Sequence, residues 1–247
     1  MLPNVTHRPS QNFDHRRDVA NQTKISMLVL HYTGMQSCEE ALERMCDKAA
    51  KVSAHLLIDE DGAVYRLVED NQRAWHAGRS YWRGVSDINS ASVGIELVNP
   101  GHEFGYQDFP DAQIKSLIAI AQGITERHNI APTGIVGHSD IAPGRKTDPG
   151  ERFPWARLAS EGIGLWPVDW PSKSQEKPNS GTSWGDLASI GYPVPGNPAC
   201  GGDILDPVSG KKDVLLAFQR RFLPDHLTGS LDDLTASRIA SVAATYS

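Results

Sequence analysis

The chain has 247 residues and a net charge of −6, from 24 lysines and arginines and 30 aspartates and glutamates. Hydrophobic residues make up 39% and charged residues 22%, which is typical of a soluble globular protein with one large domain or two unequal ones. The acidic balance leaves no strongly basic surface, so we expect neither nucleic acid nor an anionic membrane as a partner.

The N-terminal segment and the cysteines bear on the compartment. Residues 1–24 lack the apolar core of a signal peptide, and no later run is long enough to span a bilayer. We expect a cytoplasmic protein, with a periplasmic one as the alternative if a signal peptide has been removed. Cys38 and Cys46 fall on one predicted helix about 12 Å apart, too far for a disulfide. With Cys200 as the third, we interpret all three as reduced thiols.

Strand and helix patterns alternate from residue 25 onward. The segment "ISMLVLHYT" is an apolar, β-branched run that predicts a buried strand ending near His31. Ser37 and Glu40 have the spacing of a capping box and predict the start of a helix. "AHLLIDEDGAVYRLV" then predicts a β-hairpin around Asp61 and Gly62.

The same alternation continues to about residue 170. "SVGIELVN" predicts another buried strand, and "GIVGH" predicts a short one that ends at His138. Between them, residues 111–130 carry a helical apolar stripe, with Asp111 as the expected N-cap. These patterns predict an α/β domain.

The stretch "GHSDIAPGRKTDPG", residues 137–150, concentrates charged side chains in a segment broken by two prolines. The simplest interpretation is a solvated surface turn. However, His31 and His138 both stand at predicted strand ends, and a stiffened loop delivers Asp148 ten residues after His138. Two histidines, one carboxylate and an open position are what hydrolysis by zinc requires. The pattern makes His31, His138 and Asp148 candidate ligands of a Zn²⁺ ion, with the solvated turn as the alternative.

Two further residues are candidates for catalysis. Glu96 interrupts the apolar strand "SVGIELVN", where an unpaired buried carboxylate costs several kcal/mol. It is either an outward-facing residue of an edge strand or a general base near the metal. Lys146 stands two residues before Asp148 and is either a solvated lysine or the group that stabilises an oxyanion.

Aromatic and basic residues cluster in "RAWHAGR", residues 73–79. Trp75 and His76 fall on a predicted turn and either pack in the interior or form the wall of a substrate cleft. We assign Trp75, His76 and Arg79 as candidate substrate-binding residues.

These motifs together carry a resemblance. "VLHYTGM", "VSAHLLIDEDG", "RAWHAG", "SVGIELVN" and above all "GHSDIAPGRKTDPG" resemble the type-2 family of zinc N-acetylmuramoyl-L-alanine amidases, and in particular its AmpD-like members in muropeptide recycling. The likeness runs in consistent order through residues 25–167. It implies a mixed central β-sheet flanked by helices, shared with the peptidoglycan recognition proteins. It also implies His31, His138 and Asp148 as zinc ligands, with Glu96 and Lys146 as catalytic groups.

The resemblance further implies a reaction. The enzyme would hydrolyse the amide bond between N-acetylmuramic acid, or its 1,6-anhydro form, and L-alanine in muropeptides or peptidoglycan. Two alternatives remain open: a recognition protein that binds muropeptide without cutting it, and a zinc peptidase that cuts within the stem peptide. All five groups of the catalytic set are present in this chain, which favours the amidase.

The C-terminal part has a different composition. Residues 171–183 are polar and rich in proline and serine, which indicates a linker between an amidase domain at 1–170 and a small helical module at 184–247. "LASIGYPV" and "DVLLAFQRRF" resemble a peptidoglycan-binding module, with Val214, Phe218 and Phe222 on one apolar stripe. The alternative is a structural bundle that packs against the amidase domain.

Overall fold

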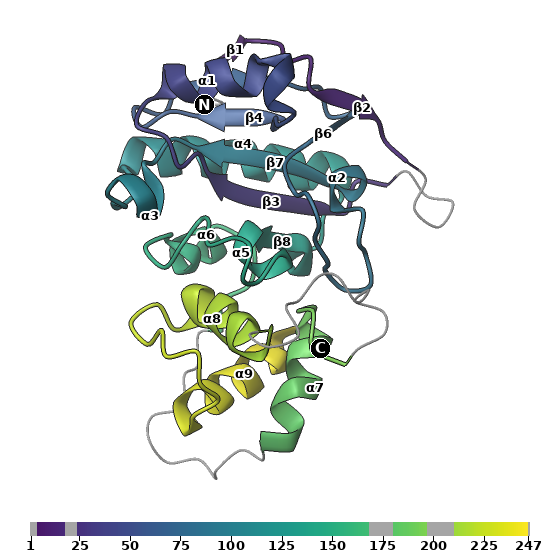
Figure 1. Cartoon of the computed structure of the whole chain (residues 1–247), viewed down its shortest axis with the longest axis vertical. Helices are drawn as coiled ribbons and strands as arrows, with labels where there is room; N and C mark the ends of the chain where they lie inside the picture. The colour runs from purple at the N-terminus through teal and green to yellow at the C-terminus, as the bar shows by residue number, and fades with distance from the viewer. Residues whose placement is uncertain (1–3, 18–23, 168–179, 197–209, 247) are drawn as a thin grey trace.

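The computed structural model describes residues 4–17, 24–167, 180–196 and 210–246. A six-stranded sheet forms the centre of the molecule, with strands in the order β1-β5-β4-β7-β3-β8 (Figure 1). All neighbouring pairs are parallel except the antiparallel β4–β5 hairpin. The six strands are β1 (Val5–His7), β3 (Met27–Tyr32), β4 (Leu56–Ile58), β5 (Val64–Arg66), β7 (Ser92–Leu97) and β8 (Ile135–Gly137).

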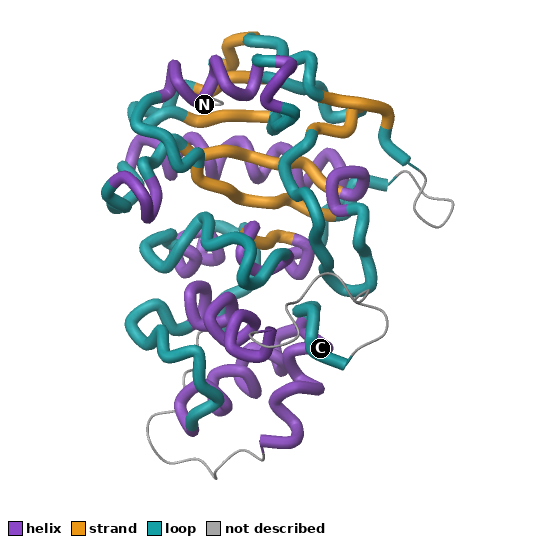
Figure 2. Tube along the Cα trace, in the orientation of Figure 1, coloured by secondary structure: helices purple, strands orange, loops and turns teal. Residues whose placement is uncertain are grey.

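A second, smaller sheet pairs β2 (Phe13–His15) with β6 (Gln72–Ala74) in antiparallel orientation. Helices cover the larger sheet on both sides, as Figure 2 shows in purple. The predicted class, a mixed central sheet flanked by helices, is confirmed. The helices are α1 (Cys38–Cys46), α2 (Ile88–Ala91), α3 (Gly101–Phe104), α4 (Asp111–His128), α5 (His138–Ile141), α6 (Trp155–Ser160), α7 (Ser180–Ile190), α8 (Gly210–Phe222) and α9 (Asp233–Tyr246), with 3-10 turns at Lys48–Ala50 and Pro132–Gly134.

Alternation along the central strands assigns each side chain to one of two cores. Leu28 and Leu30 of β3 are fully buried in the core that contains the apolar stripe of α4. Met27 and Val29 point to the opposite face, where they join a core built largely from α7, α8 and α9. Because side chains alternate, His31 belongs to this second face and lies at the carboxyl end of its strand.

Several local predictions are confirmed. Ser37 caps α1 by accepting a hydrogen bond from the backbone N–H of Glu40. The hairpin turns at Asp61 and Gly62, and Gly62 adopts the positive φ of +89° that such turns require. Cys38 and Cys46 are free thiols at opposite ends of α1, whereas Cys200 lies outside the described residues.

Two local predictions are wrong. Asp111 is the first helical residue of α4 instead of its N-cap, which is Pro110, and its carboxylate pairs with Lys115 and Arg157. The sequence predicts a loop directly after Gly137, but residues 138–141 form the single helical turn of α5. The Asp140 carboxylate accepts the Gly137 N–H and thereby satisfies the start of this turn.

The C-terminal helices pack directly on the sheet. Val214 and Phe218 of α8 and Ile239 of α9 are fully buried in one apolar cluster with Val29 and Val136 of the sheet. Figure 1 shows α8 beneath α5 and β8. Helix α7 begins at residue 180, inside the segment predicted as a linker, and residues 171–179 of that segment lie outside the described residues. These contacts favour the structural alternative, although the boundaries 1–170 and 184–247 stay a prediction.

Candidate metal centre and catalytic groove

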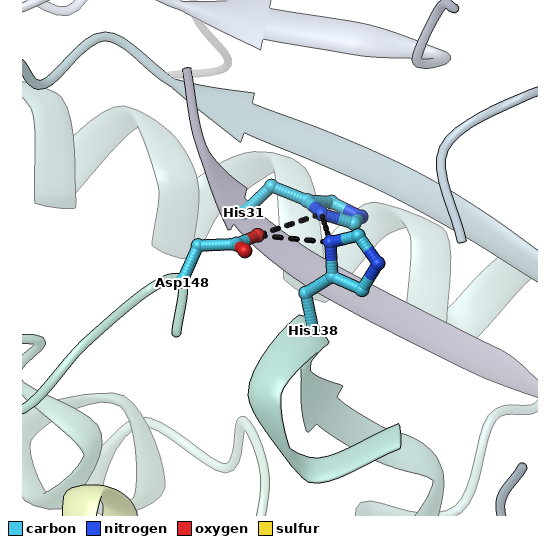
Figure 3. A group of neighbouring side chains, drawn as sticks. All are labelled: His31, His138 and Asp148. Carbon is cyan, nitrogen blue, oxygen red and sulfur yellow. Dashed lines mark hydrogen bonds and ion pairs between the residues drawn. The ribbon is translucent and has the colours of Figure 1, made fainter. Parts of the chain in front are cut away.

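Three residues from separate elements meet at the carboxyl edge of the sheet. His31 is the penultimate residue of β3, His138 begins α5 directly after β8, and Asp148 follows on the loop (Figure 3). Because β3 and β8 are parallel neighbours, their carboxyl ends lie side by side. The backbone N–H of Ser139 donates to the Asp148 carbonyl oxygen at 2.8 Å. This bond holds the loop segment with Asp148 next to the end of β8.

The polar atoms of this trio form a compact triangle. Nδ1 of His31 lies 2.9 Å from Nδ1 of His138, and Oδ2 of Asp148 lies 3.0 Å and 3.1 Å from these two nitrogens. A tetrahedral zinc ion with bonds of about 2.0–2.1 Å holds its nitrogen and oxygen ligands about 3.3 Å apart. The three side chains are almost completely buried, and together they form a group that could hold a metal ion. The donor set therefore fits a zinc ion.

The electrostatics of the trio favour the protonation states that metal binding needs. Desolvation lowers the pKa of His31 to about 4, with a further contribution from the neighbouring His138. The pKa of Asp148 is well below its usual value, because the adjacent histidines outweigh its desolvation. At neutral pH, His31 is therefore neutral and Asp148 is ionised, as ligands must be.

Glu96 lies next to His31. The two residues are register partners on the parallel strands β3 and β7, so their side chains share one face of the sheet. Strand β7 is flanked by β4 and β3, and this excludes the edge-strand interpretation of Glu96. Its Oε2 is buried without a hydrogen-bond partner in the described part of the chain. Desolvation and then the charge of Asp148 raise the pKa of Glu96 well above its usual value, while Lys146 opposes the shift.

A groove of about 840 Å³ opens beside the trio and Glu96. His76, Glu96, His138, Lys146 and Asp148 all line it. Residues of α1 and α3 form other parts of its wall, including Arg44, Met45, His102, Glu103 and Phe104. Its dimensions suit a ligand of several sugar or amino-acid units.

The three predicted substrate-binding residues lie in different places. His76 is buried, with its Nδ1 3.0 Å from Nε2 of His31, and lines the groove. The groove lining does not include Trp75, whose indole donates to Asp14, or Arg79, which is exposed and whose carbonyl accepts from Arg145. The substrate roles of Trp75 and Arg79 therefore stay predictions without support from this geometry.

A buried polar cluster centred on Asp140, a residue of α5 itself, was not predicted from the sequence. Asp140 accepts hydrogen bonds from Tyr192 at 2.6 Å and from Arg221 of α8 at 2.8 Å. The guanidinium of Arg221 also stacks over the ring of Trp155, 4.1 Å from its centroid. Tyr192, which follows α7, and Arg221 of α8 thus support the turn that carries His138.

Comparison with known proteins agrees with this geometry. The family described as N-acetylmuramoyl-L-alanine amidase matches residues 21–151. The N-acetylmuramoyl-L-alanine amidase AmiD of Escherichia coli K12 is 34% identical over 92% of this chain and 86% of its own length. The 1,6-anhydro-N-acetylmuramyl-L-alanine amidase AmpD of Haemophilus influenzae is 35% identical, over 65% of this chain and 93% of its own.

Two solved structures extend the similarity to the C-terminal helices. AmiD from E. coli in complex with the substrate anhydro-N-acetylmuramic acid-L-Ala-D-γ-Glu-L-Lys superposes with a TM-score of 0.77 and 31% identity, over 96% of this chain and 99% of that one. AmpDh3 from Pseudomonas aeruginosa with anhydromuramic pentapeptide also gives 0.77, at 29% identity over 93% and 96% of the two chains. No helix among the described residues is long and apolar enough to cross a membrane.

Proposed function

The chain belongs to the N-acetylmuramoyl-L-alanine amidase family, and from this premise we propose that it hydrolyses the amide bond between N-acetylmuramic acid, or its 1,6-anhydro form, and L-alanine in peptidoglycan fragments during cell-wall recycling. The observation that carries the proposal is the convergence of His31, His138 and Asp148 beside Glu96, at a groove lined by Glu96, His138 and Asp148. Anhydromuramyl peptides are the molecules bound in the structures of two relatives.

His31, His138 and Asp148 would hold a Zn²⁺ ion. Two imidazole nitrogens and one carboxylate oxygen are a common donor set for catalytic zinc, and three protein ligands leave a position open. When bound there, the ion supplies Lewis acidity, which polarises a carbonyl group and makes water more acidic.

Glu96 is assigned as the general base and then the general acid. Its carboxyl group lines the groove, and burial raises its pKa, which increases its affinity for a proton as a general base requires. It takes a proton from the attacking water as the water oxygen bonds to the lactyl carbonyl carbon. It returns this proton to the alanine nitrogen as the C–N bond breaks, so that a carboxylic acid and a free amine leave.

Lys146 is assigned to the oxyanion. Its half-buried side chain lines the groove, and its positive charge acts on Glu96. An ammonium group at this place stabilises the negative charge that develops on the carbonyl oxygen. Comparable groups lower the barrier by about 3–4 kcal/mol.

Substitution of the two catalytic groups tests these roles. Glu96→Gln should keep zinc and bind anhydromuramyl tripeptide while lowering kcat by ~10²-fold or more. Lys146→Met should lower kcat by ~10²–10³-fold with little change in bound zinc. Glu126→Gln, an exposed carboxylate on α4, is the matched control and should behave as wild type. Near wild-type turnover in Glu96→Gln would assign the base elsewhere.

The cytoplasm remains the predicted compartment of this enzyme. Small soluble muropeptides are the substrates that such a location favours. Fractionation of the native host followed by immunodetection tests the compartment. Detection of the protein in the periplasmic fraction would contradict the cytoplasmic prediction.

A further inference from the structure

A hydrogen-bonded chain leads from His31 into the protein interior. Nε2 of His31 lies 3.0 Å from Nδ1 of His76, and Nε2 of His76 lies 3.2 Å from Oγ of Ser92. The hydroxyl of Ser92 in turn lies 2.6 Å from the carbonyl oxygen of Ile88. All three side chains are buried, so no bulk water competes for these bonds.

The last acceptor, the Ile88 carbonyl, fixes which group donates in each of these hydrogen bonds. A carbonyl oxygen can only accept, so Ser92 must donate its hydroxyl hydrogen to Ile88. Ser92 then accepts from Nε2–H of His76, which leaves Nδ1 of the neutral His76 ring without a proton. That nitrogen accepts from Nε2–H of His31. In consequence, Nδ1 of His31 is the bare nitrogen, and it faces Asp148.

The same loop orients the second histidine. Nε2 of His138 lies 3.1 Å from the carbonyl oxygen of Ala77, the residue after His76. The Arg145 guanidinium also lies near Nε2, at 3.4 Å, but its Nη2 donates to the same Ala77 carbonyl at 2.6 Å. The closer partner of Nε2 is therefore the carbonyl, which can only accept, so Nε2 carries the proton. The bare nitrogen of His138 is again Nδ1, the atom that lies 3.1 Å from Asp148. The amide oxygen of Asn89 accepts from the backbone N–H groups of both His76 and Ala77 and holds the two residues in place.

A glycine in the sheet leaves room for the His76 ring. Gly94 is an isolated glycine in the interior of β7, and a Cβ there would lie 2.6 Å from the ring of His76. Glycine within a strand often marks such a close approach of another group. Two independent features thus fix the His76 ring: the room left by Gly94 on β7, and the hydrogen bond to Ser92.

We propose that His76 is a positioning residue for the metal centre: together with the Ala77 carbonyl it orients the two histidines so that both Nδ1 atoms face the ion, and it does not primarily bind substrate. The proposal rests on the proposed zinc site at His31, His138 and Asp148. Partners that fix the ring orientation of metal-bound histidines typically change metal affinity by 10–100-fold.

Zinc affinity, measured by competition with a chromophoric chelator, tests this role. His76→Leu fills the space above Gly94 but removes the acceptor, and it should weaken zinc binding by ~10–100-fold. His76→Asn offers an amide oxygen close to the position of Nδ1 and should recover most of the affinity. His55→Leu is the matched control, because His55 is equally buried and lies beside His76, yet bonds to Arg16 and the Gly94 N–H. It should bind zinc within about 3-fold of wild type, provided that circular dichroism shows a folded chain.

Two further measurements test the proposal even if the His76 variants do not fold: zinc binding by Ser92→Ala, and nitrogen-15 NMR of the wild-type chain. Ser92→Ala removes only the acceptor at the far end of the chain, and it should weaken zinc binding several-fold. In the zinc-loaded wild-type chain, His31 and His138 should both carry their proton on Nε2, with Nδ1 facing the ion. An Nδ1–H tautomer in either residue, or equal affinities in wild type and folded His76→Leu, would overturn the proposal. Failure of the wild-type chain to bind zinc would instead overturn the proposed metal site.

Discussion

The buried ion pair between Arg221 and Asp140 should be a major determinant of stability. Both side chains are 1% exposed, and Nη1 of Arg221 lies 2.8 Å from Oδ2 of Asp140. Arg221→Met keeps most of the aliphatic volume but leaves the carboxylate buried without its counter-charge. Removal of one partner from such a pair costs about 3–5 kcal/mol. For a chain of this length, that corresponds to a decrease in Tm of about 6–20 °C.

Urea unfolding, followed by tryptophan fluorescence at pH 7.5, measures this loss. Asp140→Leu should destabilise the protein to a similar degree, because Arg221 is then left unpaired. The double variant should be less destabilised than the sum of the two single variants, since neither charge remains buried alone. Strict additivity, or a loss below about 1 kcal/mol for Arg221→Met, would refute the argument.

Three further predictions follow from the structure. Removal of metal by a chelator should abolish hydrolysis, and added Zn²⁺ should restore it; full activity in a verified metal-free sample would contradict the metal centre. Burial, with a contribution from the charge of Arg16, lowers the pKa of His55 to about 3. The unfolded chain therefore binds more protons, and the free energy of unfolding should fall as the pH decreases from about 6.5 toward 3, by about 5 kcal/mol at most from this residue. Urea midpoints of wild type and His55→Gln between pH 4 and 8 test this, and an identical slope in both would count against it. Deletion of residues 176–247 should give an unfolded or aggregated chain, because it exposes Met27 and Val29 and removes both side-chain partners of Asp140. A folded, active truncated enzyme would restore the separable-module interpretation.

The proposed metal ligands could be predicted because local patterns carry them. His31 lies near the end of a clearly apolar strand, and His138 follows another, so parallel pairing brings the two together. Asp148 could be selected because two prolines stiffen the loop that bears it. Glu96 was recognisable as a charged residue in an apolar strand, but whether β7 lies at an edge depends on strand order. Strand order is a property of the whole chain.

The supporting residues could not be predicted in the same way. Asp140, Tyr192 and Arg221 come from segments up to 81 residues apart, and only tertiary packing shows that they share one buried cluster. Gly94 offered a sequence clue to the position of His76, because a glycine inside an apolar strand indicates the close approach of another group. Composition indicated a linker before residue 184, but it could not show that the following helices complete the core beneath β3 and β8.

Product analysis tests the central claim most directly. The purified, zinc-loaded chain is incubated with anhydro-N-acetylmuramic acid-L-Ala-D-γ-Glu-L-Lys, and the products are identified by mass spectrometry. Cleavage at the proposed amide should yield free anhydro-N-acetylmuramic acid and a tripeptide that begins with L-alanine. An anhydromuramyl product that retains L-alanine would indicate a peptidase, and an intact substrate bound to the zinc-loaded protein would indicate a recognition protein; either result would contradict the amidase assignment.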